Sequence, residues 1–397
     1  MSALNFNAKI LIVIHSLHSI IELFINTFLV AYFLHITNNN IIPASLFYIF
    51  TYVLLGFSFI ALGPLVKCGN QLLLYRSGFI INALVLLAIV ALKENITSYI
   101  WVLGVATGIE KALFYFPQNM MTAKANPGES IIRFNGYRYA WNGAIKIITP
   151  VIFGWFITKD SFINTASFVI ILTLAEFVFS YFLFFEPSKS KAFHIKSVLA
   201  LALKRKTISL SLVTEFIRGI VFDALDLLIV LYVIYMFKTS LNLGIFTSVF
   251  AFCSIAISFI FGRFVRFGTF MPILIVSSVL TFVGTTYFVL DVSQFSFIVY
   301  NFVLATATHL IRIVIDINFY KVSQNKSVTT IYRAEYMAVR ELFLNLGRIL
   351  GFIFIITVSL LGCDEMLKYL ILIFSGLIVL IGYMSLALSN RLIAKSL

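Results

Sequence analysis

The chain has 397 residues, of which 61% are hydrophobic and 11% charged, and its formal net charge is +13. A soluble domain carries roughly 25% charged residues, so this composition excludes an ordinary soluble fold and predicts a chain that lies in lipid. It also argues against nucleic-acid binding, because the positive charge is better explained by loops on one side of a membrane, and no basic face accompanies a soluble fold.

Spanning helices need about 20 mostly apolar residues each, and the sequence has twelve stretches of that kind. In chain order they are residues 10–35, 43–66, 73–92, 98–121, 136–158, 163–185, 208–236, 243–262, 270–290, 295–320, 336–361 and 366–390. The connections are short, apart from one long basic segment near the middle. We therefore predict an all-α integral membrane protein with twelve transmembrane helices in two six-helix bundles.

The long basic segment divides the chain into an N-terminal bundle at 1–187, a cytoplasmic linker at 188–207 and a C-terminal bundle at 208–397. Within the linker, residues 198–203 followed by a Lys-Arg-Lys run predict a short amphipathic helix at the membrane surface. Lysine and arginine are concentrated on the side of the linker and both termini. Because such loops stay cytoplasmic, we expect a multi-pass plasma-membrane protein with both termini in the cytoplasm.

The two halves also share residues at an offset of about 200, which predicts an internal duplication. The matched positions are His18 with Arg218, Asn26 with Asp226, Tyr32 with Tyr232, and the loop Gly63–Gly69 with Gly262–Gly268. Six helices per copy is an even number, so both copies have the same topology. Parallel halves of this kind are a known plan of transporters.

This arrangement of six plus six spans with a basic central loop resembles the major facilitator superfamily over the whole chain. The loop Gly63–Gly69 is similar to the superfamily's Gly-x-x-x-Asp-Arg-x-Gly-type loop, although it is one residue shorter and has Lys67 in place of the acid. The resemblance implies a divergent member that works by alternating access. It also implies that helices 1, 4, 5, 7, 10 and 11 line a central cavity.

Ionisable residues inside spanning helices are costly and mark candidate functional sites. Arg76 and Lys368 lie near the ends of the third and twelfth spans and are counted with the loops. Apart from these and Glu176 on the sixth span, the charges within the spans fall on the six helices that the resemblance places around the cavity. Glu176 is interpreted as part of a local structural pair. Arg138, Arg340 and Glu341 lie within about a turn of the cytoplasmic end, where anchoring to headgroups or capping is as good an interpretation as a functional role.

Helical spacing places the interior residues on narrow polar stripes, such as His15, His18, Glu22 and Asn26 on one face of the first span. Glu110 and Lys111 are adjacent and cannot pair with each other, so at least one needs a partner on another helix. Burial favours a protonated carboxyl and a nearby cation favours the carboxylate, so interior acids are candidate proton carriers. The predicted proton-coupling residues are Glu22, Asp226 and Asp316. The predicted substrate-binding residues are His18, Asn26, Glu110, Lys111, Asn142, Lys146, Arg218, Asp223, Arg312, Asn345 and Arg348.

These observations predict a monomeric secondary active transporter that moves a small amphipathic or charged solute, with the proton as coupling ion. Two alternatives stay open: movement of a lipid or lipid-linked substrate between leaflets, and a non-transporting receptor or scaffold. The sequence has no zinc motif, nucleophile elbow or phosphate-binding glycine loop. We therefore expect neither an enzyme, nor a metal site, nor a cofactor.

Overall fold

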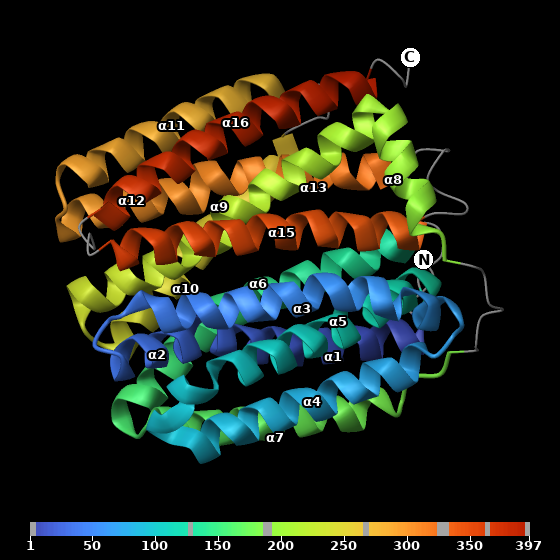
Figure 1. Cartoon of the computed structure of the whole chain (residues 1–397), viewed down its shortest axis with the longest axis horizontal. Coiled ribbons are helices and arrows are strands. Elements are labelled where there is room, and N and C mark those ends of the chain that lie inside the picture. The colour runs from blue at the N-terminus through green and yellow to red at the C-terminus, as the bar shows by residue number, and fades with distance from the viewer. Residues whose placement is uncertain are drawn as a thin grey trace. The chain divides into compact units, whose positions relative to one another are not determined.

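The computed structural model describes residues 5–125, 130–185, 193–264, 270–323, 333–361 and 366–393, and these are mainly helical (Figure 1). The opening of the predicted linker and most of the loop Gly262–Gly268 lie outside the described residues. The elements are α1 Phe6–Leu23, η1 Phe24–Leu29, α2 Val30–Ile36, α3 Ile41–Lys67, α4 Gln71–Leu92, η2 Lys93–Tyr99, α5 Ile100–Ala125, α6 Ser130–Lys159, α7 Phe162–Ser180, α8 Ile195–Lys204, α9 Lys206–Phe237, α10 Ser240–Phe264, α11 Phe270–Leu290, α12 Gln294–Val303, η4 Leu304–Thr308, α13 His309–Ser323, α15 Arg333–Leu360 and α16 Leu367–Ile393.

Each predicted span coincides with helical structure. Within the described part of the chain, ten stretches are long and apolar enough to cross a membrane. One of these, Gln71–Thr122, takes in α4, the 3₁₀ segment η2 and α5 together, and α6 is not among the ten. The short helix predicted in the linker is α8, whose Val198 is buried beside Ile208 and Tyr336.

Two of the predicted spans contain π-helical segments, which the apolar pattern does not reveal. In the first span η1 separates α1 from α2, and in the tenth span η4 separates α12 from α13. A π turn bonds residues five apart and so rotates the side chains that follow it relative to an α-helix. Asn26 lies inside η1, so the predicted α-helical stripe of His15, His18, Glu22 and Asn26 does not continue unbroken to Asn26.

The sixth span is shorter than predicted, because α7 ends at Ser180 and not at residue 185. The Asn7 side chain binds the backbone of Phe184 twice: it donates to the carbonyl oxygen at 2.7 Å and accepts from the N–H at 3.2 Å. Arg76 donates to the carbonyl oxygen of Ser180 at 3.2 Å. These side chains satisfy backbone groups that a longer helix would have paired internally.

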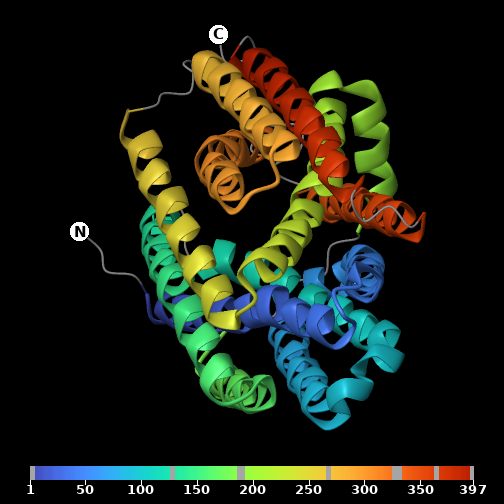
Figure 2. The ribbon, with the colours of Figure 1, turned by 90° about the vertical axis from the view of Figure 1, so that its left-hand side faces the viewer.

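The chain divides into two compact units, and each is described by itself. The first unit comprises Met1–Phe193 and Val230–Val249, and the second comprises His194–Ile229 and Phe250–Leu397. In the first unit α5 packs against α3 and α4, and α4 also packs against α7. In the second unit α11 and α16 lie side by side (Figure 2).

Glycines lie at close helix contacts in both units. A Cβ atom added at Gly108 would clash with the carbonyl oxygen of Thr51, where α5 meets α3. One added at Gly347 would clash with the carbonyl oxygen of Phe216, where α15 meets α9. Small residues let spanning helices approach closely enough for dispersion contacts to hold them together.

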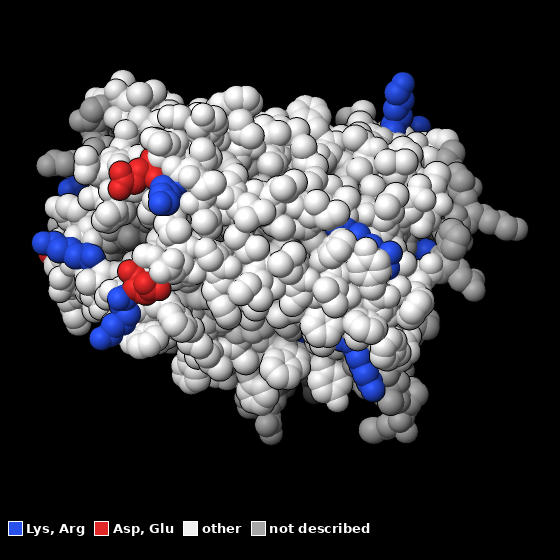
Figure 3. Space-filling model, turned by 90° about the horizontal axis from the view of Figure 1, so that it is seen from below, with Lys and Arg blue, Asp and Glu red and all other residues white. Residues whose placement is uncertain are grey.

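The outward-facing side chains are largely apolar, as a lipid-facing surface requires. Leu73, Phe252 and Tyr383 are each strongly exposed on long helices. Figure 3 shows one face whose middle is white, with charged side chains towards the left and right of the view. Because charge in the hydrocarbon core is costly, this distribution fits helices whose middle portions lie in lipid.

Candidate functional site

A buried ion pair joins α1 to α5 in the first unit. Lys111 Nζ lies 2.9 Å from Glu22 Oε1, and the Tyr115 hydroxyl donates to Glu22 Oε2 at 2.5 Å. Lys111 and Tyr115 are four residues apart on α5, so both face the same carboxylate. The lysine side chain is almost completely buried, whereas that of Glu22 is 28% exposed. Lys111 thus finds on α1 the partner that the adjacent Glu110 cannot provide.

His15 connects three helices of the first unit through neutral partners. One ring nitrogen lies 2.8 Å from Gln118 on α5, and the other lies 3.1 Å from Asn142 on α6. Ser19 donates to the side-chain oxygen of Asn142 at 3.1 Å. Asn142, predicted from sequence as a substrate-binding residue, therefore holds α6 to α1 in this conformation.

A second cluster of the first unit contains His18, Glu110 and Glu176. His18 Nδ1 lies 3.3 Å from Glu176 Oε1, and His18 Nε2 lies 4.0 Å from Glu110 Oε1. The three residues come from α1, α5 and α7 and are 0–2% exposed. Glu176 has a partner close by, as the sequence suggested, and that partner, His18, lies on another helix. It belongs to an interior cluster built by three helices.

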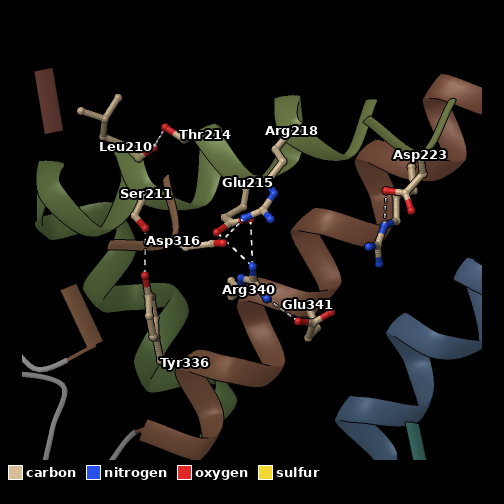
Figure 4. Close-up of polar contacts among 11 residues, drawn as sticks. Leu210, Ser211, Thr214, Glu215, Arg218, Asp223, Asp316, Tyr336, Arg340 and Glu341 are labelled. Atoms are coloured by element: carbon tan, nitrogen blue, oxygen red, sulfur yellow. Dashed lines mark hydrogen bonds and ion pairs between the residues drawn. The ribbon is translucent and has the colours of Figure 1, made fainter. Parts of the chain in front are cut away.

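The second unit holds a network of acids and arginines on α9, α13 and α15 (Figure 4). Arg340 donates to both carboxylate oxygens of Glu215 at 3.2 Å and lies 2.5 Å from Glu341. Arg218 lies 2.6 Å from Asp316 and 3.5 Å from Glu215. Glu215 is 1% exposed, so its charge is compensated by two guanidinium groups in the interior. Arg340 is thus bound into a network and is not a simple headgroup anchor.

Two further ion pairs of the second unit lie farther along α9. Arg348 donates from Nε to Asp223 Oδ2 at 2.9 Å and from Nη1 to Asn345 Oδ1 at 2.9 Å. Arg312 lies 3.5 Å from Asp226, and its guanidinium group stacks over the Phe222 ring at 4.1 Å. These pairs bring together five predicted residues.

Asn26 and Lys146 are predicted site residues that these clusters do not include. The backbone carbonyl oxygen of Asn26 accepts a hydrogen bond from Tyr48 at 3.2 Å. Its side-chain oxygen is buried without a hydrogen-bond partner among the described residues. Lys146 is exposed on α6.

The sequence-based set omitted several residues that the clusters contain: Tyr115, Gln118, Glu176, Glu215, Arg340 and Glu341. Spacing along α5 offered a signal for two of them, because Tyr115 and Gln118 follow Lys111 at i+4 and i+7 on one helical face. For Arg340 and Glu341, closeness to a helix end left two interpretations open in the sequence, anchoring or capping and a functional role.

No family model matches the chain, and no curated protein matches it. Several solved structures, however, match the chain. A bacterial homologue of the iron transporter ferroportin, in an inward-facing state, aligns with a TM-score of 0.70 at 14% identity over 98% of this chain and 100% of that chain. A bacterial metal transporter gives 0.66 at 14% identity over 98% and 100%. The nucleoside transporter NupG gives 0.67 at 15% identity over 97% and 99%.

At this level of identity the likeness shows the fold. The chain shares the fold of these membrane transporters over nearly its whole length. With its long apolar helices, the protein is an all-α, multi-pass membrane protein.

Proposed function

We propose that this protein is a secondary active transporter that moves a small charged or amphipathic solute across the cytoplasmic membrane by alternating access, coupled to protons. In this proposal twelve spanning helices form two six-helix bundles at 1–187 and 208–397, joined by a cytoplasmic linker, and a single chain suffices. The fold shared with three membrane transporters supports the class of function.

The observation that carries the proposal is that the interior charges form ion pairs between different spanning helices. Lys111 with Glu22 joins α5 to α1, and Arg348 with Asp223 joins α15 to α9. Buried ion pairs contribute little net stability compared with apolar packing, so stability alone is a poor reason for them. Pairs that exchange partners with a solute or a proton keep every buried charge compensated through a transport cycle.

The interior side chains include both positive and negative charges, and this favours a solute that is itself charged or zwitterionic. In this proposal Lys111 and Arg312 bind an anionic group, and Glu22, Asp226 and Asp316 are the candidate proton carriers. Glu22 is the strongest of the three, because Asp226 and Asp316 are 61% and 49% exposed and each is held by an arginine, which stays protonated in proteins.

The test uses the purified full chain in liposomes with an imposed pH gradient. The solute panel includes nucleosides, iron and other metal ions, which are the cargoes named for the neighbouring structures. It also includes anionic and zwitterionic metabolites and amphipathic drugs. We expect one class to drive proton movement, and we expect Glu22→Gln to abolish that movement. Asp226→Asn and Asp316→Asn test the second unit, and Glu94→Gln is the control, since Glu94 is exposed at the helix connection η2.

Full coupling in all three carboxylate variants would contradict proton coupling through these residues. Solute uptake without proton movement would indicate a transporter that is not coupled to protons. Movement of a fluorescent lipid between leaflets, in place of any solute, would favour the lipid-moving alternative. A native protein that moves nothing in the panel or in the lipid assay would favour a receptor or scaffold.

A further inference from the structure

The His18, Glu110 and Glu176 cluster places two carboxyl groups against one imidazole in the interior of the first unit. Among the described residues, both ring nitrogens of His18, both carboxylate oxygens of Glu176 and Oε1 of Glu110 have no conventional hydrogen-bond partner. Buried polar atoms are nearly always paired, and the exceptions need an explanation. An unpaired buried carboxylate is especially costly.

The surroundings provide little compensating positive charge. The His18 ring stacks on Phe114 with centroids 3.4 Å apart, and Tyr115 meets its edge at 5.7 Å. The buried Tyr75 of α4 lies close enough to Glu176 to interact electrostatically, and its hydroxyl also lacks a partner among the described residues. His15 and Lys111 lie within electrostatic reach of His18, and Lys111 is bound to Glu22.

The cluster has to hold protons, because without them its charge would be too large for an apolar interior. With both carboxyls ionised and the imidazole neutral, the three side chains carry a charge of about −2 in an apolar interior, which is prohibitively costly. Two bound protons make the cluster neutral. These protons are distributed either over both carboxyls or over the imidazole and one carboxyl, because the imidazole can accept at one nitrogen while donating from the other.

We propose that His18, Glu110 and Glu176 form the proton-binding site of this transporter, with Glu22 as the group that loads it. This inference rests on the proposed function. Glu22 is partly exposed, lies one helical turn from His18 on α1 and acts electrostatically on all three members of the cluster. Loading moves one proton from the Glu22 carboxyl to a ring nitrogen of His18. The Nδ1–H bond then breaks as an O–H bond forms on Glu176 Oε1, 3.3 Å away.

Occupancy of the cluster is coupled to Lys111 through Glu22. When Glu22 is ionised it holds Lys111 at 2.9 Å, and when it carries a proton in transit it no longer does. A released ammonium group is then available to an anionic solute. Proton loading and solute binding are thereby linked through Glu22, because its carboxylate cannot carry the proton and hold Lys111 at the same time.

The first test detects the protons directly, without any solute. Infrared spectra of the purified full chain at neutral pH should contain the carbonyl stretch of a protonated, buried carboxylic acid. Glu176→Gln and Glu110→Gln should each shift or reduce that band, and Glu94→Gln should leave it unchanged. A native spectrum without such a band, or one that neither cluster variant alters, would overturn the inference. Glutamine is neutral and of similar size, so these variants should fold.

The second test measures coupling with the solute that gives the largest native proton flux in the panel. In Glu176→Gln and His18→Gln we expect solute counterflow, which needs no net proton movement, to stay within about twofold of native. We expect solute-driven proton flux to fall at least tenfold. Equal proton flux in native and variant proteins would overturn the role of the cluster while the proposed function stands. A native protein that couples no solute to protons would overturn both.

Discussion

The two units place different chemistry at matched positions of the predicted repeat. His15 and His18 of α1 correspond, at an offset of 200, to Glu215 and Arg218 of α9. In the first unit the two imidazoles meet amides and carboxyl groups. In the second unit the acid and the guanidinium belong to a network in which Glu215 contacts two arginines. The polar positions are shared, whereas the groups that occupy them are not.

The sequence predicted proton-coupling and substrate-binding residues in both halves, and this difference suggests that the two halves are not equivalent. Arginine cannot be deprotonated in a protein, so the network of the second unit carries fixed charges. Imidazole and carboxyl groups can each gain and lose a proton, and buried carboxyls change their charge when their partners move. The proposed proton-binding cluster lies in the first unit, whereas the arginine network of the second unit carries fixed charge.

We expect the largest effect when two isosteric substitutions, one in each unit, are compared. Glu215→Gln removes the shared acid of Arg218 and Arg340 and should lower the free energy of unfolding by about 3 kcal/mol, since breaking a buried ion pair leaves charge uncompensated. Glu176→Gln should change it by less than about 1 kcal/mol, because a protonated carboxyl and an amide are both neutral. Denaturant unfolding of both variants in the same detergent measures the difference. Equal losses would mean that Glu176 is ionised and paired with a charged His18.

The helices were predictable because lipid imposes a simple rule on sequence. A spanning segment must be apolar over about 20 residues, and the predicted range 270–290 matches α11 at both ends. The rule says nothing about backbone register, so the π segments η1 and η4 were missed. It also overextended α7, because the end of that helix is fixed by Asn7, which lies far away in sequence.

The candidate site was predictable in outline for the same reason, and its pairings were not. A charge on an apolar helix is visible in the sequence, so Glu22, Lys111 and Asp223 could be singled out. Which acid meets which base depends on how the helices pack. Glu176 was set aside because it is the sole charge on its helix, yet three helices bring it to His18.

Close helix packing offers a second comparison between the units. Gly347→Ala in the second unit and Gly108→Ala in the first each add a methyl group that meets a carbonyl oxygen of the facing helix. Overpacking of this kind costs about 1–3 kcal/mol. We expect a larger loss at Gly347, because Gly219 and Gly351 also bring backbone into close contact between α9 and α15. Gly376→Ala is the control, since a Cβ there would have no neighbour within 4 Å. A Gly347→Ala protein as stable as the control would show that the α9–α15 contact adjusts freely.

The smallest expected effects lie at helix N-termini, where the two units differ in the number of capping bonds. Ser293 accepts from the Ser296 N–H at 3.2 Å while Ser296 accepts from the Ser293 N–H at 3.1 Å, so α12 begins with a reciprocal pair. Ser161 makes a single such bond, from the Asn164 N–H at 3.1 Å, at the start of α7. Losing a capping side chain costs about 1 kcal/mol, and Ser293→Ala should cost more than Ser161→Ala because the Ser296 hydroxyl also loses a hydrogen-bonding neighbour. Amide hydrogen exchange in the first turns of α12 and α7 resolves so local a change. If the first turn of α7 is destabilised as much as that of α12, the contact between the Ser293 and Ser296 hydroxyls adds nothing to the cap.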